Sequence, residues 1–269
     1  MRTLAQYSIR NIGGDDLLAV ITLDRPEKCN ALNGGLISSI MARMEQVTTN
    51  PFVRVVILNG TGGTFCAGAD LTELSEANEK NGNDPYWGGV GLVVSCWERL
   101  FEKVRRSPKP TIAVVHGAAL GGGAALASVC DYVILDPKAT MGYPETTRGI
   151  IPALASVYLL RQVGERQASR LLIGGEIVDA EEAVRIGLAT FVRDDPMRCA
   201  EELAGRIAKC GPRALAGTKK IIRNRPAIGD ASHIAFRHLI SGEAREGLAS
   251  FVENRKPDWS SSLRRNNNG

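Results

Sequence analysis

Two glycine-rich segments, each preceded by a short apolar run, limit most strongly what this chain can fold into. Residues 60–68 follow the run Val53 to Leu58, and residues 117–123 follow the run Thr111 to Val115. Continuous aliphatic and β-branched runs are typical of parallel strands that are buried on both faces. Segments with helical character follow both glycine-rich segments. The pattern therefore predicts an α/β fold in which each glycine-rich loop connects a buried strand to a helix.

Strands and helices alternate in the N-terminal half of the chain, whereas helices dominate the C-terminal half. We expect strands at residues 7–12, 17–23, 53–58, 111–115 and 132–135. We expect helices at residues 33–48, from 70, and at 92–106, 124–129, 154–163, 165–172, 180–186, 197–210, 212–224 and 231–249. This order predicts an α/β core over residues 1–195, a C-terminal helical region over 196–260 and a disordered tail over 261–269.

Composition and charge exclude several classes of protein. The hydrophobic fraction of 44% and the charged fraction of 23% are ordinary for a globular domain, which argues against a disordered, fibrous or membrane protein. The net charge of +4, from 33 basic and 29 acidic residues, is too small to indicate a nucleic-acid partner. The six cysteines form no CxxC pair and residues 1–9 contain no apolar signal segment, so we expect a cytoplasmic protein.

The two glycine-rich loops are candidates for an oxyanion site. A junction between a strand and a helix leaves backbone N–H groups without intrahelical partners. If the two preceding strands are neighbours, both loops emerge at one edge of the sheet, and two N–H groups can converge on one carbonyl oxygen. The alternative is a pair of simple turns in which glycine supplies a positive φ. Neither loop has the spacing of a phosphate-binding or dinucleotide-binding motif.

Glu145 is the candidate acid or base. It lies in the segment Gly142 to Gly149, and Pro144 stiffens the chain directly before it. A carboxylate on a rigid corner is suited to general acid–base chemistry. The alternatives are helix capping by Thr146 and an ion pair between Glu145 and Arg148. No GxSxG motif is present, and the histidine pair His233 and His238 has the wrong spacing for a shared metal, so no metal site is expected.

Four motifs together resemble the crotonase (enoyl-CoA hydratase/isomerase) superfamily, in its order and at its approximate spacing. They are Arg25 to Asn33, Phe65 to Leu71, Gly117 to Gly123, and Gly142 to Glu145. The segment Phe251 to Pro257 resembles the closing helix of that family. The resemblance covers nearly the whole chain and implies a crotonase-type repeated ββα core, followed by a helical region that forms trimers or hexamers.

The resemblance also implies a site for an acyl-CoA thioester, with CoA as part of the substrate and with no separate cofactor. In this family two backbone N–H groups bind the thioester oxygen, and the matching positions here are Ala67 and Gly122. Glu145 matches a catalytic glutamate. The residues implied in CoA binding are Lys28, Ala31, Asp70, Leu71, and, often from a neighbouring subunit, Phe251 and Lys256.

One departure from the family pattern bears on the reaction. Hydratases of the family usually have two glutamates, and the position of the first is Ala125 in this chain. A single glutamate is compatible with hydration of an enoyl-CoA, including a branched one, with double-bond isomerisation, and with decarboxylation. Hydrolysis is disfavoured because residues 151–156 contain no Asp. Two non-enzyme alternatives are an acyl-CoA-binding protein without turnover and an RNA-binding helix carrying Lys219, Lys220, Arg223 and Arg225.

Overall fold

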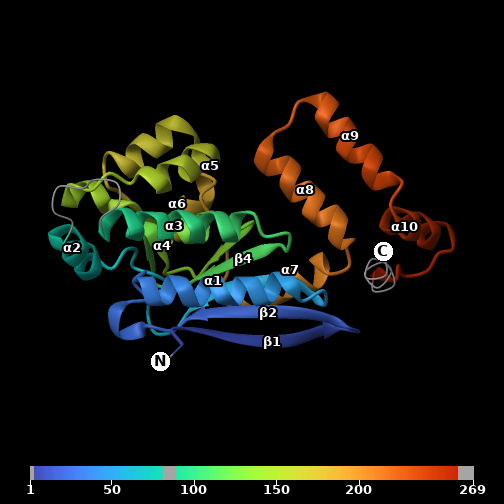
Figure 1. The fold of residues 1–269 in the computed structure, drawn as a ribbon, viewed down its shortest axis with the longest axis horizontal. Helices are drawn as coiled ribbons and strands as arrows, with labels where there is room; N and C mark the ends of the chain where they lie inside the picture. The colour runs from blue at the N-terminus through green and yellow to red at the C-terminus, as the bar shows by residue number, and fades with distance from the viewer. Residues whose placement is uncertain (1–2, 81–88, 260–269) are drawn as a thin grey trace.

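A computed structural model describes residues 3–80 and 89–259 of the chain (Figure 1). Its main sheet has six strands in the order β1-β2-β3-β4-β6-β9. The first pair is antiparallel and the other pairs are parallel. The strands are β1 (Ala5–Gly13), β2 (Asp16–Leu23), β3 (Val53–Gly60), β4 (Thr111–Val115), β6 (Tyr132–Leu135) and β9 (Phe191–Val192). The predicted α/β class is therefore confirmed.

A second, three-stranded sheet lies beside the first in the order β5-β7-β8. It consists of β5 (Ala118–Leu120), β7 (Thr140–Gly142) and β8 (Ile177–Asp179). These three strands and β9 are absent from the strands expected from sequence, and β7, β8 and β9 interrupt the C-terminal half in which only helices were expected. Strands of two or three residues are too short to show the alternation that reveals a strand in sequence. β5 lies inside the second glycine-rich loop and holds it to β7.

Ten α-helices and two 3₁₀-helices occupy the described residues. They are η1 (Pro26–Lys28), α1 (Gly34–Thr49), α2 (Leu71–Lys80), α3 (Gly89–Arg105), α4 (Gly122–Ser128), η2 (Pro144–Arg148), α5 (Ala153–Leu172), α6 (Ala180–Arg185), α7 (Pro196–Ile207), α8 (Pro212–Asn224), α9 (Ile228–Leu239) and α10 (Gly242–Val252). α1 begins where predicted, because the Asn33 side chain accepts a hydrogen bond of 2.9 Å from the Leu36 N–H. None of these helices has the length and apolar character needed to cross a membrane.

Hydrophobic clusters cover both faces of the main sheet. Alternate residues of β2 point to opposite faces, so Ala19 and Ile21 join one cluster and Leu18 and Val20 join the other. The first cluster includes buried residues of α1, α3, α4 and α5, and the second is closed by α7. Because α7 packs on the sheet, only the helices after it extend away from the core.

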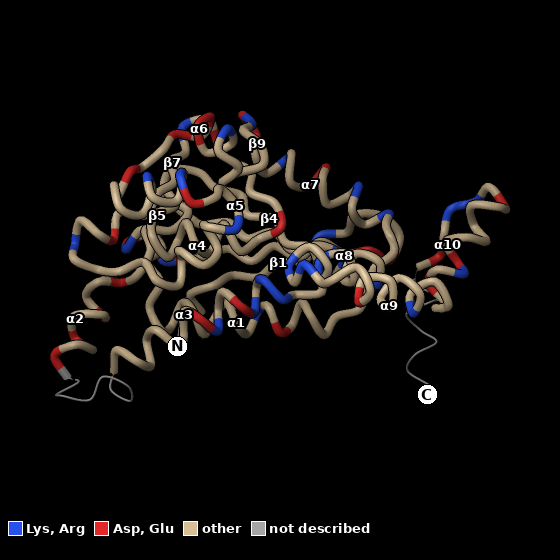
Figure 2. Tube along the Cα trace, turned by 90° about the horizontal axis from the view of Figure 1, so that it is seen from above, with Lys and Arg blue, Asp and Glu red and all other residues tan. Residues whose placement is uncertain are grey.

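Helices α8, α9 and α10, which we call the C-terminal arm, extend to one side of the core (Figures 1 and 2). The predicted single helix over residues 231–249 was wrong. The chain instead forms α9 and α10, because the Ser241 hydroxyl caps α10 by accepting a hydrogen bond of 3.2 Å from the Ala244 N–H. The predicted tail at 261–269 lies outside the described residues.

Candidate active site

The two glycine-rich loops meet at the carboxyl ends of β3 and β4, which are adjacent parallel strands. The Cys66 N–H donates to the Ala118 carbonyl oxygen at 3.2 Å, and the Leu120 N–H donates to the Cys66 carbonyl oxygen at 3.0 Å. The approach requires glycine, since a Cβ at position 123 would lie 2.2 Å from the Cys66 carbonyl oxygen. The predicted convergence of the two loops is therefore confirmed, as is its origin in neighbouring strands.

The structure corrects the assignment of Ala67 as an oxyanion donor. The Ala67 N–H donates to the Cys29 carbonyl oxygen at 2.9 Å and is therefore already engaged. The segment containing Cys29 and Leu32 runs beside this loop, and the Leu32 carbonyl oxygen accepts the Asp70 N–H at 3.1 Å. The N–H groups of Ala67 and Asp70 thus bond this segment, whereas that of Ala69, which lies between them, does not.

Ala69 and Gly122 each carry a free backbone N–H group, and the two residues lie close together. The Ala69 nitrogen lies 3.6 Å from the position that a Cβ on Gly122 would take. Gly122 is the first residue of α4, so its N–H has no intrahelical acceptor. Neither N–H has an acceptor among residues 3–80 and 89–259. This pair is therefore a candidate oxyanion site at a helix N-terminus.

Glu145 projects from η2 toward the second glycine-rich loop. Gly121 adopts φ +52°, and a Cβ there would lie 2.8 Å from Glu145 Oε1. Glu145 Oε2 is buried and has no hydrogen-bond partner within the described part of the chain. Burial raises the pKa of Glu145, while its own backbone N–H and the nearby Arg148 lower it. An ionisable group with a raised pKa beside free backbone donors is typical of a catalytic acid or base.

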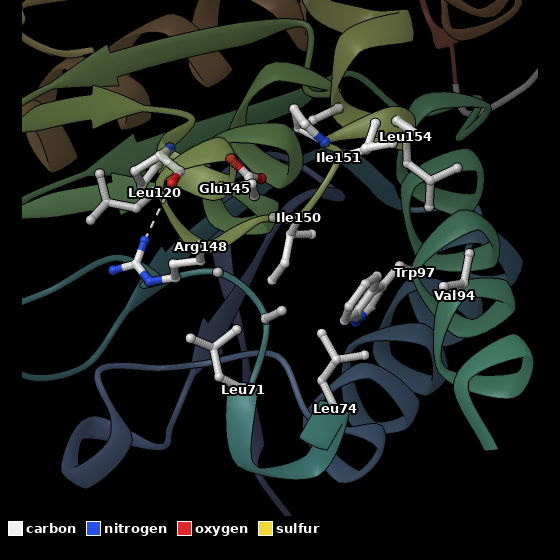
Figure 3. A pocket seen from close by; sticks show the side chains of 18 of the residues that line it. Leu71, Leu74, Val94, Trp97, Leu120, Glu145, Arg148, Ile150, Ile151 and Leu154 are labelled. Atoms are coloured by element: carbon white, nitrogen blue, oxygen red, sulfur yellow. Dashed lines mark hydrogen bonds between the residues drawn. The ribbon is translucent and has the colours of Figure 1, made fainter. Parts of the chain in front are cut away.

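Of the two alternative roles considered for the Glu145 segment, helix capping by Thr146 is observed and an ion pair between Glu145 and Arg148 is not. The Thr146 hydroxyl donates to the carbonyl oxygen of Leu172, the last residue of α5, at 3.1 Å. Arg148 donates to the Pro144 carbonyl oxygen at 3.4 Å (Figure 3), and it forms no ion pair within 4.0 Å among the residues that the structure describes.

The corner that carries Glu145 is anchored on two sides. The Tyr143 ring is completely buried, and its hydroxyl lies 3.0 Å from the Ser128 hydroxyl of α4. On the other side, the Gly121 N–H donates to the Gly142 carbonyl oxygen at 2.8 Å. The strand that ends at Gly142 is thereby bonded to the loop that carries Gly122. Glu145 and the free N–H groups are consequently held in one rigid unit.

A cavity of about 370 Å³ opens beside this unit (Figure 3). Most of its wall is apolar, and Glu145 and Arg148 are the only lining residues with ionisable side chains in the described part of the chain. The apolar side chains come from α2, α3, the glycine-rich loops and the start of α5, and include Leu71, Leu74, Val94, Trp97, Phe101, Leu120, Ile150, Ile151 and Leu154. The cavity suits an apolar chain whose reactive end lies beside Glu145 and the free N–H groups.

Ala125 lies on the first turn of α4, as predicted, but it is completely buried and does not line the cavity. Within residues 3–80 and 89–259, Glu145 is the only carboxylate in the cavity wall. In the same ranges, no group of three or more His, Cys, Asp and Glu side chains is close enough to hold a metal ion.

The residues implied in CoA binding do not all lie in the cavity wall. Leu71 lines the cavity, whereas Asp70 caps α2 and forms an ion pair of 2.6 Å with Arg25. Burial opposes ionisation of Asp70, but its hydrogen bond to Arg25 and the backbone N–H groups of α2 lower its pKa. Lys28 is exposed on η1, and the Ala31 carbonyl oxygen accepts a hydrogen bond of 3.0 Å from Arg25.

Phe251 and Lys256 lie at the end of the C-terminal arm, away from the cavity of the same chain (Figures 1 and 2). Both are exposed, and 85% of Phe251 is accessible.

Comparisons with family models, with protein sequences and with solved structures all point to the same family. The family model described as enoyl-CoA hydratase/isomerase matches residues 14–262. The 2,3-dehydroadipyl-CoA hydratase of Escherichia coli is 32% identical over 249 residues, which cover 89% of this chain and 94% of that protein. The short-chain-enoyl-CoA hydratase of Clostridium acetobutylicum is also 32% identical, over 89% of this chain and 92% of its own. A crystal structure of an enoyl-CoA hydratase/isomerase from Marinobacter aquaeolei superposes with a TM-score of 0.85 at 29% identity, covering 94% of this chain and 98% of that one.

Proposed function

The chain belongs to the enoyl-CoA hydratase/isomerase family, and from this premise we propose that it hydrates an enoyl-CoA thioester with Glu145 as its single acid–base group. One observation carries the proposal. Glu145 is the only carboxylate in a largely apolar cavity whose wall also carries the free N–H groups of Ala69 and Gly122. This set can hold an enolate and move one proton, which is what hydration requires.

The Ala69 and Gly122 N–H groups would bind the thioester carbonyl oxygen. When water attacks C3 of the enoyl group, the π electrons move toward the thioester and leave negative charge on that oxygen. Backbone donors held in place beforehand stabilise this charge without reorganising, and each such donor contributes about 2.7–4 kcal/mol. We therefore propose Ala69, in place of Ala67, as the partner of Gly122.

Glu145 would carry the proton in both directions. As an ionised carboxylate it takes a proton from the water molecule whose oxygen bonds to C3. It then gives that proton to C2, and the enolate returns to a thioester. The enzyme is unchanged at the end, and the substrate has gained one water molecule. A single group placed on one face of the substrate can perform both transfers.

Double-bond isomerisation is the second candidate reaction. It uses the same enolate and the same donors, with Glu145 removing a proton from C2 and returning it at C4. The observation that favours it is Ala125, because no second carboxylate of the described chain lines the cavity to hold a water molecule. Decarboxylation of an acyl-CoA would also pass through this enolate.

The CoA part of the substrate would extend from the cavity past Leu71 and Asp70 toward Lys28 and Ala31. The remaining contacts, by Phe251 and Lys256, would come from the arm of a neighbouring chain, since these residues lie away from the cavity of their own chain. We propose that the chain forms a trimer, or a hexamer made of two trimers. Of the predicted assembling region 196–260, α7 packs on the core sheet, so α8, α9 and α10 would make the contacts between chains.

A mass-spectrometric assay in ¹⁸O-labelled water tests the proposal. The protein is incubated with unbranched and branched enoyl-CoA esters, and each product is weighed and fragmented. Hydration adds one heavy water molecule, whereas isomerisation keeps the mass and moves the double bond. Saturable binding of the esters with no change in any of them would contradict turnover and support an acyl-CoA-binding protein instead.

A further inference from the structure

The segment from Arg25 to Leu32 runs beside the first glycine-rich loop and fixes the backbone around Ala69. Leu32 forms an isolated parallel bridge with Ala69. The Leu32 N–H donates to the Gly68 carbonyl oxygen at 2.7 Å, and the Leu32 carbonyl oxygen accepts the Asp70 N–H at 3.1 Å. Because the peptide between Gly68 and Ala69 is planar and trans, its N–H points away from its carbonyl oxygen. The bond to Leu32 therefore sets the direction of the Ala69 N–H.

Arg25 ties this segment to the loop with an ion pair. One nitrogen of its guanidinium, Nη1, donates to Asp70 Oδ2 at 2.6 Å and to the Ala31 carbonyl oxygen at 3.0 Å. Only 13% of the Arg25 side chain and 11% of the Asp70 side chain are accessible. Solvent and salt screen such a pair less than a surface pair, and loss of one partner leaves the other charge uncompensated. Arg25 thus joins the residue before Leu32 to the residue after Ala69.

Both carboxylate oxygens of Asp70 are bonded within the chain. Oδ2 accepts from Arg25, and Oδ1 accepts the N–H groups of Thr72 at 3.1 Å and Glu73 at 3.3 Å, at the start of α2. The carboxylate is consequently held between the segment and the helix. This arrangement suits a group that keeps the end of the loop in place.

The middle of the segment is anchored independently of this ion pair. Asn30 is completely buried, and its Nδ2 donates to the carbonyl oxygens of Thr61 at 2.9 Å and Thr64 at 2.8 Å. These bonds hold the segment to the beginning of the loop. Loss of the Arg25 side chain should therefore loosen the end of the loop that carries Ala69, while the segment stays attached.

We propose that Arg25 is a positioning residue for the reaction, whose ion pair with Asp70 holds the Ala69 N–H in the direction that binds the thioester oxygen. The inference rests on the proposed function in one respect, which is that Ala69 and Gly122 bind that oxygen. A donor that is already oriented stabilises developing charge without reorganising. A small displacement of such a group weakens this stabilisation, even when the changed residue does not touch the substrate.

The test measures how strongly the site polarises a bound thioester. The probe is butyryl-CoA labelled with ¹³C at its carbonyl carbon, which is saturated and cannot be hydrated. Isotope-edited infrared spectra compare its carbonyl stretching frequency in water and when bound to the native protein, to Arg25→Met and to Asp70→Asn. Hydrogen bonds to the carbonyl oxygen lower this frequency because they weaken the C=O bond. Asp70→Asn keeps an acceptor for the start of α2, so it tests the ion pair even if Arg25→Met does not fold.

A second ion pair in the same chain provides matched controls. Arg54 Nη1 lies 2.7 Å from Asp16 Oδ1, and Arg54 Nη2 donates to the Cys210 carbonyl oxygen at 2.6 Å. This arginine is also shielded, with 2% of its side chain accessible, and it lies at the start of β3, the end opposite to the loop. Neither residue lines the cavity. Arg54→Met and Asp16→Asn therefore repeat both substitutions away from the site.

We expect the bound carbonyl frequency to be lowered less by Arg25→Met and Asp70→Asn than by the native protein, and equally by the two controls and the native protein. In assays with an enoyl-CoA, kcat/KM should fall by about 10–100-fold in each of the first two variants, mainly through kcat. The double variant should lose little more than either single one, since the two residues act as a pair.

Native-like polarisation in folded Arg25→Met or Asp70→Asn would overturn the inference and leave the proposed function standing. An equal loss of polarisation in the controls would also overturn it, because the effect would then follow from lower stability alone. If the native protein does not lower the carbonyl frequency at all, the oxyanion site itself is wrong, and the proposed function fails together with the inference.

Discussion

The core and the C-terminal arm of this molecule treat their apolar residues in opposite ways. In the core, the side chains facing the sheet are buried, and Leu36, Met44 and Phe65 are completely inaccessible. In the arm, Phe236 remains 65% exposed, Leu239 59% and Phe251 85%. The side chains around the sheet are therefore packed within one chain, whereas the arm presents apolar residues that no described part of the same chain covers.

The residues proposed for the reaction therefore lie in the core, and those proposed for contacts between chains lie in the arm. Hydrogen bonds connect β7, which leads to Glu145, with β5 and with the start of α4, which carries Gly122. A single chain therefore contains the reactive part of the proposed site. Exposed apolar residues gathered on one unit mark an interaction surface. Changes in the core should thus alter turnover at a fixed assembly, and changes in the arm should alter assembly with a smaller effect on turnover.

The largest effect should come from Glu145→Gln, which removes the acid–base group and keeps its volume. We expect kcat to fall by about 10²–10⁴-fold with little change in CoA-ester affinity or in sedimentation. Stopped-flow or discontinuous assays with the best enoyl-CoA substrate measure the loss. Glu165→Gln, an exposed glutamate of α5, serves as the control. Near-native kcat in Glu145→Gln would remove this residue from the mechanism.

A somewhat smaller effect should follow Gly122→Pro, which deletes one backbone donor. Gly122 is the first residue of α4, where proline is tolerated in a helix, and a Cβ there would lie 3.5 Å from the nearest atom, a methyl of Leu32. We expect a loss of about 10²–10³-fold in kcat. Gly122→Ala keeps the N–H and is the control. Equal losses in both variants, or a changed circular dichroism spectrum of the proline variant alone, would contradict a specific role of this N–H.

The core was largely predictable from sequence because its signals are local and strong. Runs rich in aliphatic and β-branched residues, such as Val53 to Leu58, which contains only one polar residue, Arg54, indicated buried parallel strands. The helix expected at residues 33–48 begins at Asn33, a residue type that commonly caps helices. The convergence of the loops also followed, since it depends only on which strands are neighbours. These features rest on hydrophobic periodicity and capping, which a single sequence contains.

The identity of the first donor was not predictable in the same way. Ala67 and Ala69 are two residues apart in a loop of small residues, so composition does not distinguish them. What distinguishes them is the segment near Cys29, which engages the Ala67 N–H and leaves that of Ala69 free. That contact joins residues 38 positions apart and is a tertiary effect. The break at Ser241 was in contrast a local signal, a serine able to cap a helix, which the apolar pattern of residues 231–249 obscured.

Charged substitutions in the arm should break the proposed assembly and leave the core intact. We expect the native chain to sediment as a trimer or hexamer, and Phe236→Asp with Leu239→Asp to sediment as a smaller species. KM for the CoA ester should rise by about tenfold, equivalent to about 1.4 kcal/mol, because Phe251 and Lys256 would no longer reach a neighbouring site. The kcat value should change less than KM.

Ile173→Asp is the control for the arm variant, since Ile173 is 78% exposed but lies on the core, after α5. It should leave sedimentation unchanged. Dissociation by Ile173→Asp but not by the arm variant would locate the interface on the core. A native chain that stays monomeric across micromolar concentrations would contradict the assembly altogether.

The smallest effect on turnover should come from Ala125→Glu, which restores the second carboxylate within the core itself. Position 125 is on the first turn of α4, where the helix N-terminus favours a negative charge by about 0.3–1 kcal/mol at an exposed site. Ala125 is completely buried, however, so burial opposes ionisation and the longer side chain must displace its neighbours. We therefore expect a gain of less than about tenfold in hydration of crotonyl-CoA, together with a lower Tm. Ala125→Gln is the control, because it adds nearly the same volume without the charge. If the glutamine variant gains as much as the glutamate variant, the carboxylate has no role. If the native protein already hydrates crotonyl-CoA at an ordinary enzymatic rate, about 1–10³ s⁻¹, then one carboxylate is sufficient and Ala125 does not limit the reaction.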